Sequence, residues 1–191
     1  MMGMVFTEFL ELVEDKFSVE TADRVIQAAQ TSTGGAYTSV GKYDHAEIVR
    51  MVQALSEETK IPVTELLRVF GQHLASRFSK LYAAFFAAQP SLFDFLSTID
   101  GKIHVEVKKL YPNAELPSIQ TIESTADSHV MVYRSNRHMQ DLALGLIEGV
   151  AAHYGQDIQV ELSAQADGGI RFVVRLQIRA EQAATADASA D

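Results

Sequence analysis

The chain has 191 residues, a formal net charge of −9 and 47% hydrophobic residues. It contains no cysteine, which excludes disulfides, thiolate metal sites and a cysteine nucleophile. Because an acidic surface repels a phosphate backbone, we expect no nucleic-acid partner. No apolar run approaches the ~18 to 20 residues that cross a bilayer, and the first residues lack the basic region of a secretion signal. We therefore expect a cytoplasmic protein with no membrane segment.

The first two-thirds of the sequence are predicted to form helices. Apolar residues recur with a period of 3.6 residues from Val5 to Phe17, which indicates a first helix. Ser18 can cap a second helix, and Asp44 with Glu47 has the spacing of a capping box before a third. A longer helix is predicted within residues 62–90, between two prolines.

The segment from Ser91 to Leu110 fits two structures. Its apolar residues have helical spacing, but residues 103–107 also alternate as in a strand, and Gly101 interrupts the pattern. We favour a helix because the segment is long. Pro112 and Pro117 then end the helical part of the chain.

The rest of the chain is predicted as strand, strand, helix, strand, strand. The strands are expected at 119–122, 130–133, 158–162 and 170–178, and the helix from about 136 to 153. A turn at Asp167-Gly168-Gly169 separates the last two strands. The sequence therefore predicts an α+β fold. Residues 180–191 are rich in Ala and Asp, and we expect them to be a disordered tail.

His104 is the histidine whose surroundings best fit a ligand. A lone histidine is more often solvated or structural than a metal ligand, and spacing alone favours that simpler interpretation. His104, however, lies beside the apolar stripe of the Ser91–Leu110 segment. A neutral imidazole there can offer one nitrogen to a buried metal while a hydrogen bond orients the other nitrogen.

A second candidate site is Tyr133-Arg134-Ser135-Asn136-Arg137, where a strand is predicted to give way to a helix. Tyr133, Ser135 and Arg137 alternate, so in an extended chain their side chains can converge. Two hydroxyls and a guanidinium suit a pair of carboxylates. Taken alone, the pentapeptide favours a simpler interpretation, in which Ser135 or Asn136 caps the helix and Arg137 is solvated.

Taken together, these features resemble the H-NOX family, the haem nitric oxide/oxygen binding domains related to the haem domain of soluble guanylate cyclase. The resemblance runs from Met2 to about Ile178. It rests on Gly3-Met4-Val5-Phe6, on Val63 to Gln72 with its Val-Phe-Gly-Gln ending, on Ile99 to Pro117, and on Tyr-x-Ser-x-Arg followed by Gly-Leu-Ile-Glu-Gly. The most specific feature is Tyr-x-Ser-x-Arg with a histidine about thirty residues before it.

The resemblance implies a single domain over residues 1–179. Its helical N-terminal lobe would cover about 1–62. Its haem-ligating α/β lobe would cover about 63–179 and contain a four-stranded antiparallel sheet. Haem b (iron protoporphyrin IX) would lie between the two lobes. His104 matches the proximal iron ligand of the family. Tyr133, Ser135 and Arg137 match the residues that bind the haem propionates, and Pro117 matches the proline that presses on the porphyrin.

The resemblance also bears on the gas that is bound. Oxygen-binding members carry a distal tyrosine supported by a tryptophan and an asparagine, and the matching positions here are Leu142, Phe9 and Leu74. Val5, Phe78 and Leu146 would extend this apolar wall. Bound dioxygen carries negative charge and gains from a hydrogen-bond donor, whereas bound nitric oxide is nearly neutral. We therefore expect selectivity for nitric oxide, unless Tyr82, Tyr133 or Tyr154 reaches the pocket.

The function implied is that of a gas sensor and not of an enzyme. Nitric oxide would bind ferrous iron opposite His104, with carbon monoxide as a second ligand, and release of the histidine would signal to a separate effector protein. Family members commonly signal to a histidine kinase or a cyclic-di-GMP enzyme. Two alternatives remain: a haem-free module that binds an apolar ligand or a protein on the same scaffold, and an oxygen sensor.

Overall fold

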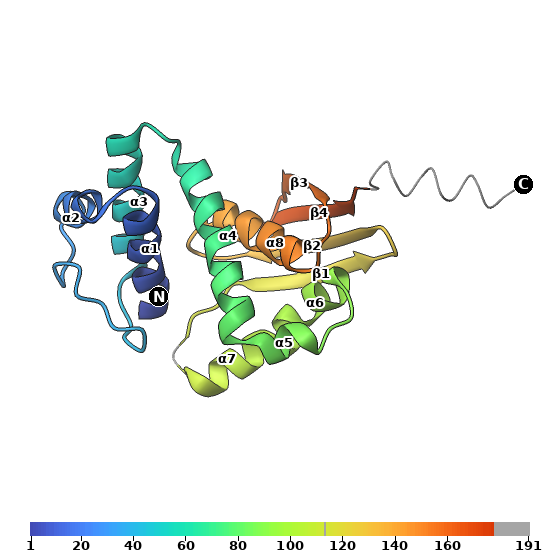
Figure 1. The fold of residues 1–191 in the computed structure, drawn as a ribbon. Coiled ribbons are helices and arrows are strands. Elements are labelled where there is room, and N and C mark those ends of the chain that lie inside the picture. Colours follow the sequence, from blue (N-terminus) through green and yellow to red (C-terminus); the bar gives the residue numbers. More distant parts are fainter. Residues whose placement is uncertain (113, 178–191) are drawn as a thin grey trace, which may run out of the picture.

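The computed structural model describes residues 1–112 and 114–177. The elements in chain order are α1 (Gly3–Lys16), α2 (Val19–Ala28), α3 (His45–Thr59), α4 (Val63–Leu81), α5 (Ala83–Ala87), α6 (Leu92–Thr98), the π-helical turn η1 (Ile99–Ile103), α7 (His104–Leu110), β1 (Ser118–Ser124), β2 (Ser128–Arg134), α8 (Gln140–His153), β3 (Ile158–Ala164) and β4 (Ile170–Leu176). Figure 1 shows α1, α2 and α3 grouped at one end and the sheet at the other. The predicted end of the last strand at Ile178, the end of the domain at 179 and the tail at 180–191 lie outside the described residues.

Side-chain caps begin three of the helices, as the sequence indicates. The hydroxyl of Ser18 accepts a hydrogen bond from the backbone N–H of Thr21, and Asp44 caps α3 in the same way. The predicted capping box is wrong, because Glu47 does not reach back to the start of α3. Glu47 is 5% exposed and accepts hydrogen bonds from Ser32 Oγ and Tyr37 Oη, both at 2.6 Å. Glu47 therefore anchors the α2–α3 loop.

The segment Ser91–Leu110 is helical, which confirms the favoured interpretation. Ser91 caps α6, accepting a hydrogen bond from the Asp94 N–H at 3.2 Å. The helix is not regular, because the π turn η1 stands between α6 and α7. Such turns are rare and are often found at functional sites. Here the turn ends on the residue before His104.

The four strands form one antiparallel sheet in the order β1-β2-β4-β3, with β2 and β4 in the centre. On one face of the sheet, Met131, Tyr133, Phe172 and Val174 join a core cluster with residues of α6 and α8. Strand periodicity explains this, because alternate residues of β2 and β4 point to the same face. The sheet and its helices therefore form the second lobe.

The helices α4 and α8 lie unusually close together, in the middle of the molecule. A Cβ added to Gly145 would collide with the carbonyl oxygen of Arg68, and one added to Gly71 would collide with that of Leu142. Glycine at these positions lets the two backbones touch. Phe78 of α4 and Leu146 of α8 pack against both core clusters, so this helix pair joins the two lobes.

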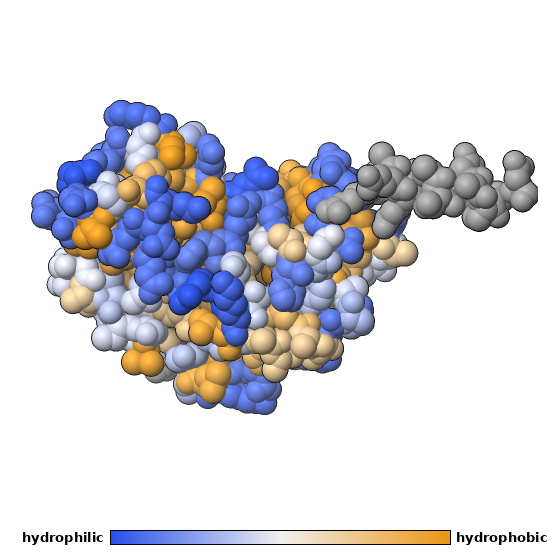
Figure 2. Space-filling view, viewed as in Figure 1, coloured by the Kyte–Doolittle hydropathy of each residue, from blue (hydrophilic) through white to orange (hydrophobic). Residues whose placement is uncertain are grey.

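No helix in residues 1–112 and 114–177 is long and apolar enough to span a bilayer. In the space-filling view, hydrophilic residues dominate the surface of the N-terminal helices, and apolar residues are more frequent toward the lower edge (Figure 2).

His129 makes the stability of the sheet depend on pH. Its ring is 0% exposed, stacks on Phe93 and lies 3.1 Å from the Ser124 hydroxyl. Burial lowers the pKa of His129 in the folded protein, so below about pH 6.5 the unfolded chain binds a proton that the folded one refuses. The contribution of His129 to stability is therefore present above that pH and is lost as the pH falls.

We expect the free energy of unfolding, measured in urea from pH 7.5 to 5, to fall more steeply in the wild type than in His129→Gln. Equal slopes would contradict this.

Candidate functional site

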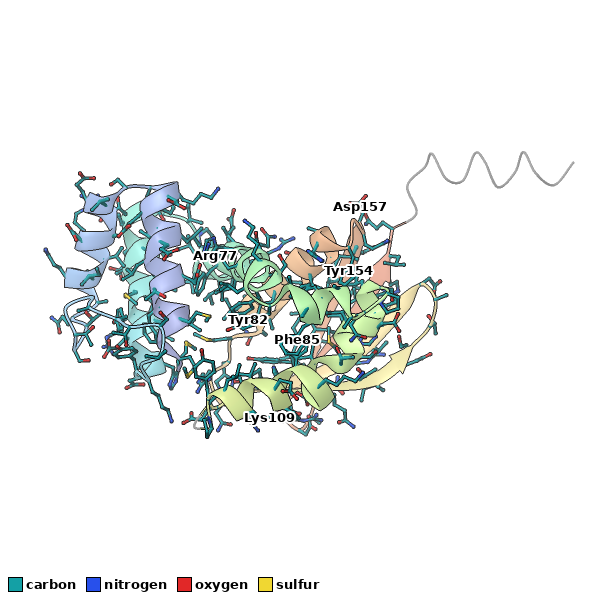
Figure 3. The ribbon with its side chains drawn as sticks, turned by 60° about the horizontal axis from the view of Figure 1, so that its bottom comes forward. Arg77, Tyr82, Phe85, Lys109, Tyr154 and Asp157 are labelled. Carbon is teal, nitrogen blue, oxygen red and sulfur yellow. The ribbon has the colours of Figure 1, made fainter. Side chains whose placement is uncertain are left out.

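A cavity of about 340 Å³ lies between the two lobes, and most of its lining is apolar. Its volume is within the range of about 300–1,000 Å³ that is usual for ligand sites. Ten residues predicted for the site line it: Val5, Leu74, Phe78, His104, Pro117, Tyr133, Ser135, Arg137, Leu142 and Leu146. They come from α1, α4, α7, β2, α8 and the loops that flank the sheet, so the fold gathers residues up to 141 positions apart in the sequence. In Figure 3, Tyr82 and Phe85 mark the end of this cavity where α4 passes into α5.

His104 is held at the first residue of α7 with one ring nitrogen engaged. Its Nδ1 lies 2.9 Å from Oδ1 of Asp100, one helical turn earlier. Burial lowers the pKa of His104, although the neighbouring Asp100 carboxylate opposes the shift. A lowered pKa keeps the imidazole neutral near pH 7, and with Nδ1 occupied it leaves Nε2 for a metal. A single axial imidazole is how several haem proteins hold their iron.

Asp100 is a functional residue that the sequence analysis missed. Its second oxygen, Oδ2, accepts hydrogen bonds from the backbone N–H of Ile119 at 2.9 Å and from the hydroxyl of Ser118 at 3.1 Å. One carboxylate therefore connects His104 to the first residues of β1. The signal available in the sequence was an acidic residue four positions before the histidine, on the same face of a helix.

The hydroxyl groups of the Tyr-x-Ser-x-Arg motif lie together at the end of β2. Tyr133 is buried, which raises its pKa, and its hydroxyl interacts with Ser135. The Ser135 hydroxyl accepts a hydrogen bond from the backbone N–H of Arg137 at 3.2 Å. The helix expected from about 136 begins only at Gln140, and no side chain caps it. The simpler interpretation of Ser135 or Asn136 as a helix cap is therefore wrong.

Arg137 places a positive charge at one edge of the cavity. Its Nη2 lies 2.9 Å from Oε2 of Glu115, and its Nη1 donates to the Glu115 backbone carbonyl at 2.8 Å. Lys42 also lines the cavity, and its Nζ lies 2.9 Å from Oε1 of the same carboxylate. The guanidinium keeps three further N–H donors, so this edge suits an anionic group.

The wall formed by α1, α4 and α8 is apolar, and one residue predicted for it lies elsewhere. Val5, Leu74, Phe78, Leu142 and Leu146 line the cavity. Phe9 does not, among the described residues; it is 1% exposed in the core of the N-terminal lobe, where its ring lies edge-to-face with Phe70 at 5.2 Å. Residue 9 lies one helical turn beyond Val5, where α1 packs against α4 instead of the cavity.

Two of the tyrosines considered as donors behave differently. Tyr154 donates its hydroxyl to the carbonyl of Phe86 at 2.8 Å and is not among the described residues that line the cavity. Tyr82 does line it, and its pKa is raised by burial and by the neighbouring Tyr111. Tyr82 is the C-cap residue that ends α4, eight positions after Leu74, which corresponds to about 12 Å along the helix axis. Tyr82 therefore lies at the far edge of the cavity, next to Tyr111.

The residues present fit a haem. The cofactor is a broad apolar disc with an iron at its centre and two carboxylates on one edge, and it needs an apolar slot, an axial donor and a polar clamp. The cavity supplies apolar side chains on the α4–α8 wall, a neutral imidazole at His104, and hydroxyl and guanidinium groups at the edge near Arg137.

Comparison with known proteins agrees with this geometry. The family model described as "Haem-NO-binding" matches residues 2–162. The chain belongs to the H-NOX family. H-NOX domains bind haem and act as gas sensors, and the fold expected from the sequence, helices with a four-stranded antiparallel sheet, is confirmed.

Solved H-NOX structures superpose over nearly the whole chain. An H-NOX protein from K. algicida, in the Fe(II) unliganded A71G mutant, is 35% identical with a TM-score of 0.90, and the match covers 95% of this chain and 100% of that one. The H-NOX protein from Shewanella woodyi, solved bound to IWP-051 in the Fe(II)CO state, is 37% identical with a TM-score of 0.81 over 94% of this chain and 96% of that one.

A curated relative is soluble guanylate cyclase 89Db of Drosophila melanogaster, 27% identical over 162 residues. The match covers 83% of this chain but only 24% of the cyclase. The chain therefore spans about a quarter of the length of that relative.

Asp100 should control how firmly His104 holds a metal. Asp100→Asn keeps the size of the side chain but removes the charge that polarises and orients the imidazole. Loss of such a partner costs about 10- to 100-fold in metal affinity, so we expect haem affinity to fall by about that factor. Haem titration followed by absorbance measures it. The control is Glu106→Gln on α7, whose carboxylate pairs with Lys109 away from His104. Equal affinities in the two variants would contradict the assignment.

Proposed function

We propose that this protein is a haem b sensor that binds nitric oxide in preference to oxygen and signals through release of His104. The observation that carries the proposal is a neutral imidazole, oriented by Asp100, which lines an apolar cavity between two lobes. The domain limits expected from the sequence, residues 1–62 and 63–179, and a cytoplasmic location are part of this proposal.

The cavity edge near Arg137 would hold the carboxylates of the cofactor. Tyr133 and Ser135 offer hydroxyl donors, and the three remaining N–H groups of Arg137 can form a two-pronged contact with a carboxylate. Pro117 lines the same cavity. It lies two residues before Ile119, whose backbone N–H donates to Asp100, the partner of His104. Pro117 would therefore press on the cofactor from the side of His104.

When bound, haem would supply a ferrous iron that binds nitric oxide, and His104 would be the residue that holds this iron and is released from it. His104 would then be free to leave while its Nδ1 stays bonded to Asp100. Because Asp100 is fixed to Ser118 and Ile119, release of the imidazole would pass to β1 as well as to α7. Gas binding would shift the equilibrium between two arrangements of the lobes only by the difference between the affinities of those arrangements for the gas.

The preference for nitric oxide is supported by the apolar wall that α4 and α8 contribute to the cavity. Leu74, Leu142 and Leu146 offer no hydrogen-bond donor, and bound dioxygen needs one more than nitric oxide does. Carbon monoxide, which is also nearly neutral, would bind as well. The effector would be a separate protein such as a histidine kinase or a cyclic-di-GMP enzyme.

The first test removes the imidazole. We expect wild-type ferrous protein to be coloured, with a Soret band, and His104→Gly to lose haem unless free imidazole is supplied, because imidazole can fill the space left by the side chain. Absorbance spectra before and after desalting measure retention. His45→Gly, which removes a surface histidine with 43% of its side chain exposed, should behave as wild type. Colourless wild-type protein would instead favour a haem-free module that binds an apolar ligand or a protein.

The second test adds a donor to the apolar wall. We expect the wild-type ferrous protein to form no stable complex in air but to bind nitric oxide, whereas Leu142→Tyr should slow oxygen dissociation by tenfold or more, since a hydrogen bond to a charged group contributes about 1.5–3 kcal/mol. Leu142→Phe is the matched control, because it adds the ring without the hydroxyl. A stable oxygen complex of the wild type would favour an oxygen sensor, with Tyr82 as the first donor to examine.

A further inference from the structure

We propose that Glu115 couples the carboxylate clamp of the cavity to the N-terminal lobe through Lys42, and that this bridge helps to retain the cofactor. The inference rests on the proposed function and adds two positioning residues to it. Neither residue belongs to the Tyr-x-Ser-x-Arg motif or to the His104 helix.

One carboxylate joins two cations from distant parts of the chain. Lys42 Nζ lies 2.9 Å from Oε1 of Glu115, and Arg137 Nη2 lies 2.9 Å from Oε2. Arg137 also donates to the Glu115 carbonyl at 2.8 Å, so the backbone of residue 115 is fixed as well as its side chain. Lys42 precedes α3, Glu115 lies between α7 and β1, and Arg137 precedes α8. This set is called the Lys42–Glu115–Arg137 bridge.

On the N-terminal side, the bridge reaches the wall of the cavity through the backbone. Lys42 forms an isolated antiparallel β-bridge with Met2, and the Gly3 N–H donates to the Gly41 carbonyl at 2.7 Å. Residues 38–43 are therefore attached to the start of α1, which carries Val5. A movement of α1 away from the sheet would pull Lys42 from Glu115.

On the other side, the bridge determines how Arg137 faces the cavity. Glu115 uses two of the five N–H donors of the guanidinium and so holds the remaining three in a fixed orientation. The Arg137 side chain is only 14% exposed, whereas those of Lys42 and Glu115 are 50% and 67% exposed. The pKa of Glu115 is lowered, first by Lys42 and then by Arg137, so its carboxylate stays ionised.

The expected effect is modest, because the Lys42–Glu115 pair is exposed. Exposed ion pairs change an equilibrium by about two- to five-fold and weaken as salt is added. Lys42→Met keeps the aliphatic chain and removes the charge, so we expect haem to leave two- to five-fold faster at low salt. Lys42→Arg, which restores a cation, should recover the wild-type rate.

The experiment measures the rate at which haem passes from the ferric protein to excess apomyoglobin, at low and at high sodium chloride concentrations. The variants are Lys42→Met, Glu115→Gln and the double variant. The matched control is Arg24→Met, which breaks the exposed Arg24–Glu58 pair between α2 and α3. Hydrogen exchange of residues 38–43 in the same proteins reports whether the loop is released from α1 and the bridge.

The bridge predicts that Lys42→Met accelerates haem loss and exchange at 38–43, that the double variant matches Glu115→Gln, and that high salt removes the difference from wild type. The inference is overturned if Lys42→Met behaves as Arg24→Met does, or if the two substitutions have additive effects. A wild type that takes up no haem contradicts the proposed function itself. A wild type that retains haem through His104 but is insensitive to Lys42→Met contradicts only the bridge.

Discussion

The hydrogen bond between Asp100 and His104 is the interaction on which the rest of the site depends. It fixes which ring nitrogen faces the cavity, and through Ser118 and Ile119 it makes the first strand of the sheet part of the same unit. The π turn separates α6 from α7, and regular α-helix resumes at His104. A displacement of the imidazole would therefore pass to β1 through these hydrogen bonds and to α7 through the backbone.

The two lobes are joined in two physically different ways. The first is the α4–α8 pair, whose backbones approach closely at Gly71 and Gly145 and whose Phe78 and Leu146 pack against both core clusters. Packed interiors of this kind tolerate little displacement. The second is the exposed ion pair between Lys42 and Glu115, which is weak and can be exchanged. A movement of the N-terminal helices that preserved the first contact would act on the second.

Sequence patterns predicted the elements well where periodicity and caps determine them. The strands of the sheet, the helix from Ser91 to Leu110 and the caps at Ser18 and Asp44 are confirmed. Patterns failed where tertiary contacts decide. Glu47 has the spacing of a capping box, but a buried carboxylate gains more from the hydroxyls of Ser32 and Tyr37.

The site shows the same division. Ten of the eleven residues that the resemblance predicted for the site line one cavity, because proteins that share these motifs and spacings share the fold that brings the residues together. It could not show that Phe9 turns into the N-terminal core, since that depends on how α1 packs against α4. Asp100 could have been suggested by its position four residues before His104, but its bonds to Ser118 and Ile119 form only in the folded chain. The Lys42–Glu115 pair, whose partners are 73 residues apart, had no local signal.

The most direct test of the account is the resonance Raman spectrum of the ferrous protein without a gas ligand. The account predicts an iron–histidine stretching band that shifts when histidine is labelled with ¹⁵N and disappears in His104→Gly. In that variant, added imidazole should restore a band that shifts with ¹⁵N-labelled imidazole. A histidine-dependent band that persists in His104→Gly without imidazole would show that another residue holds the iron, and would contradict the account.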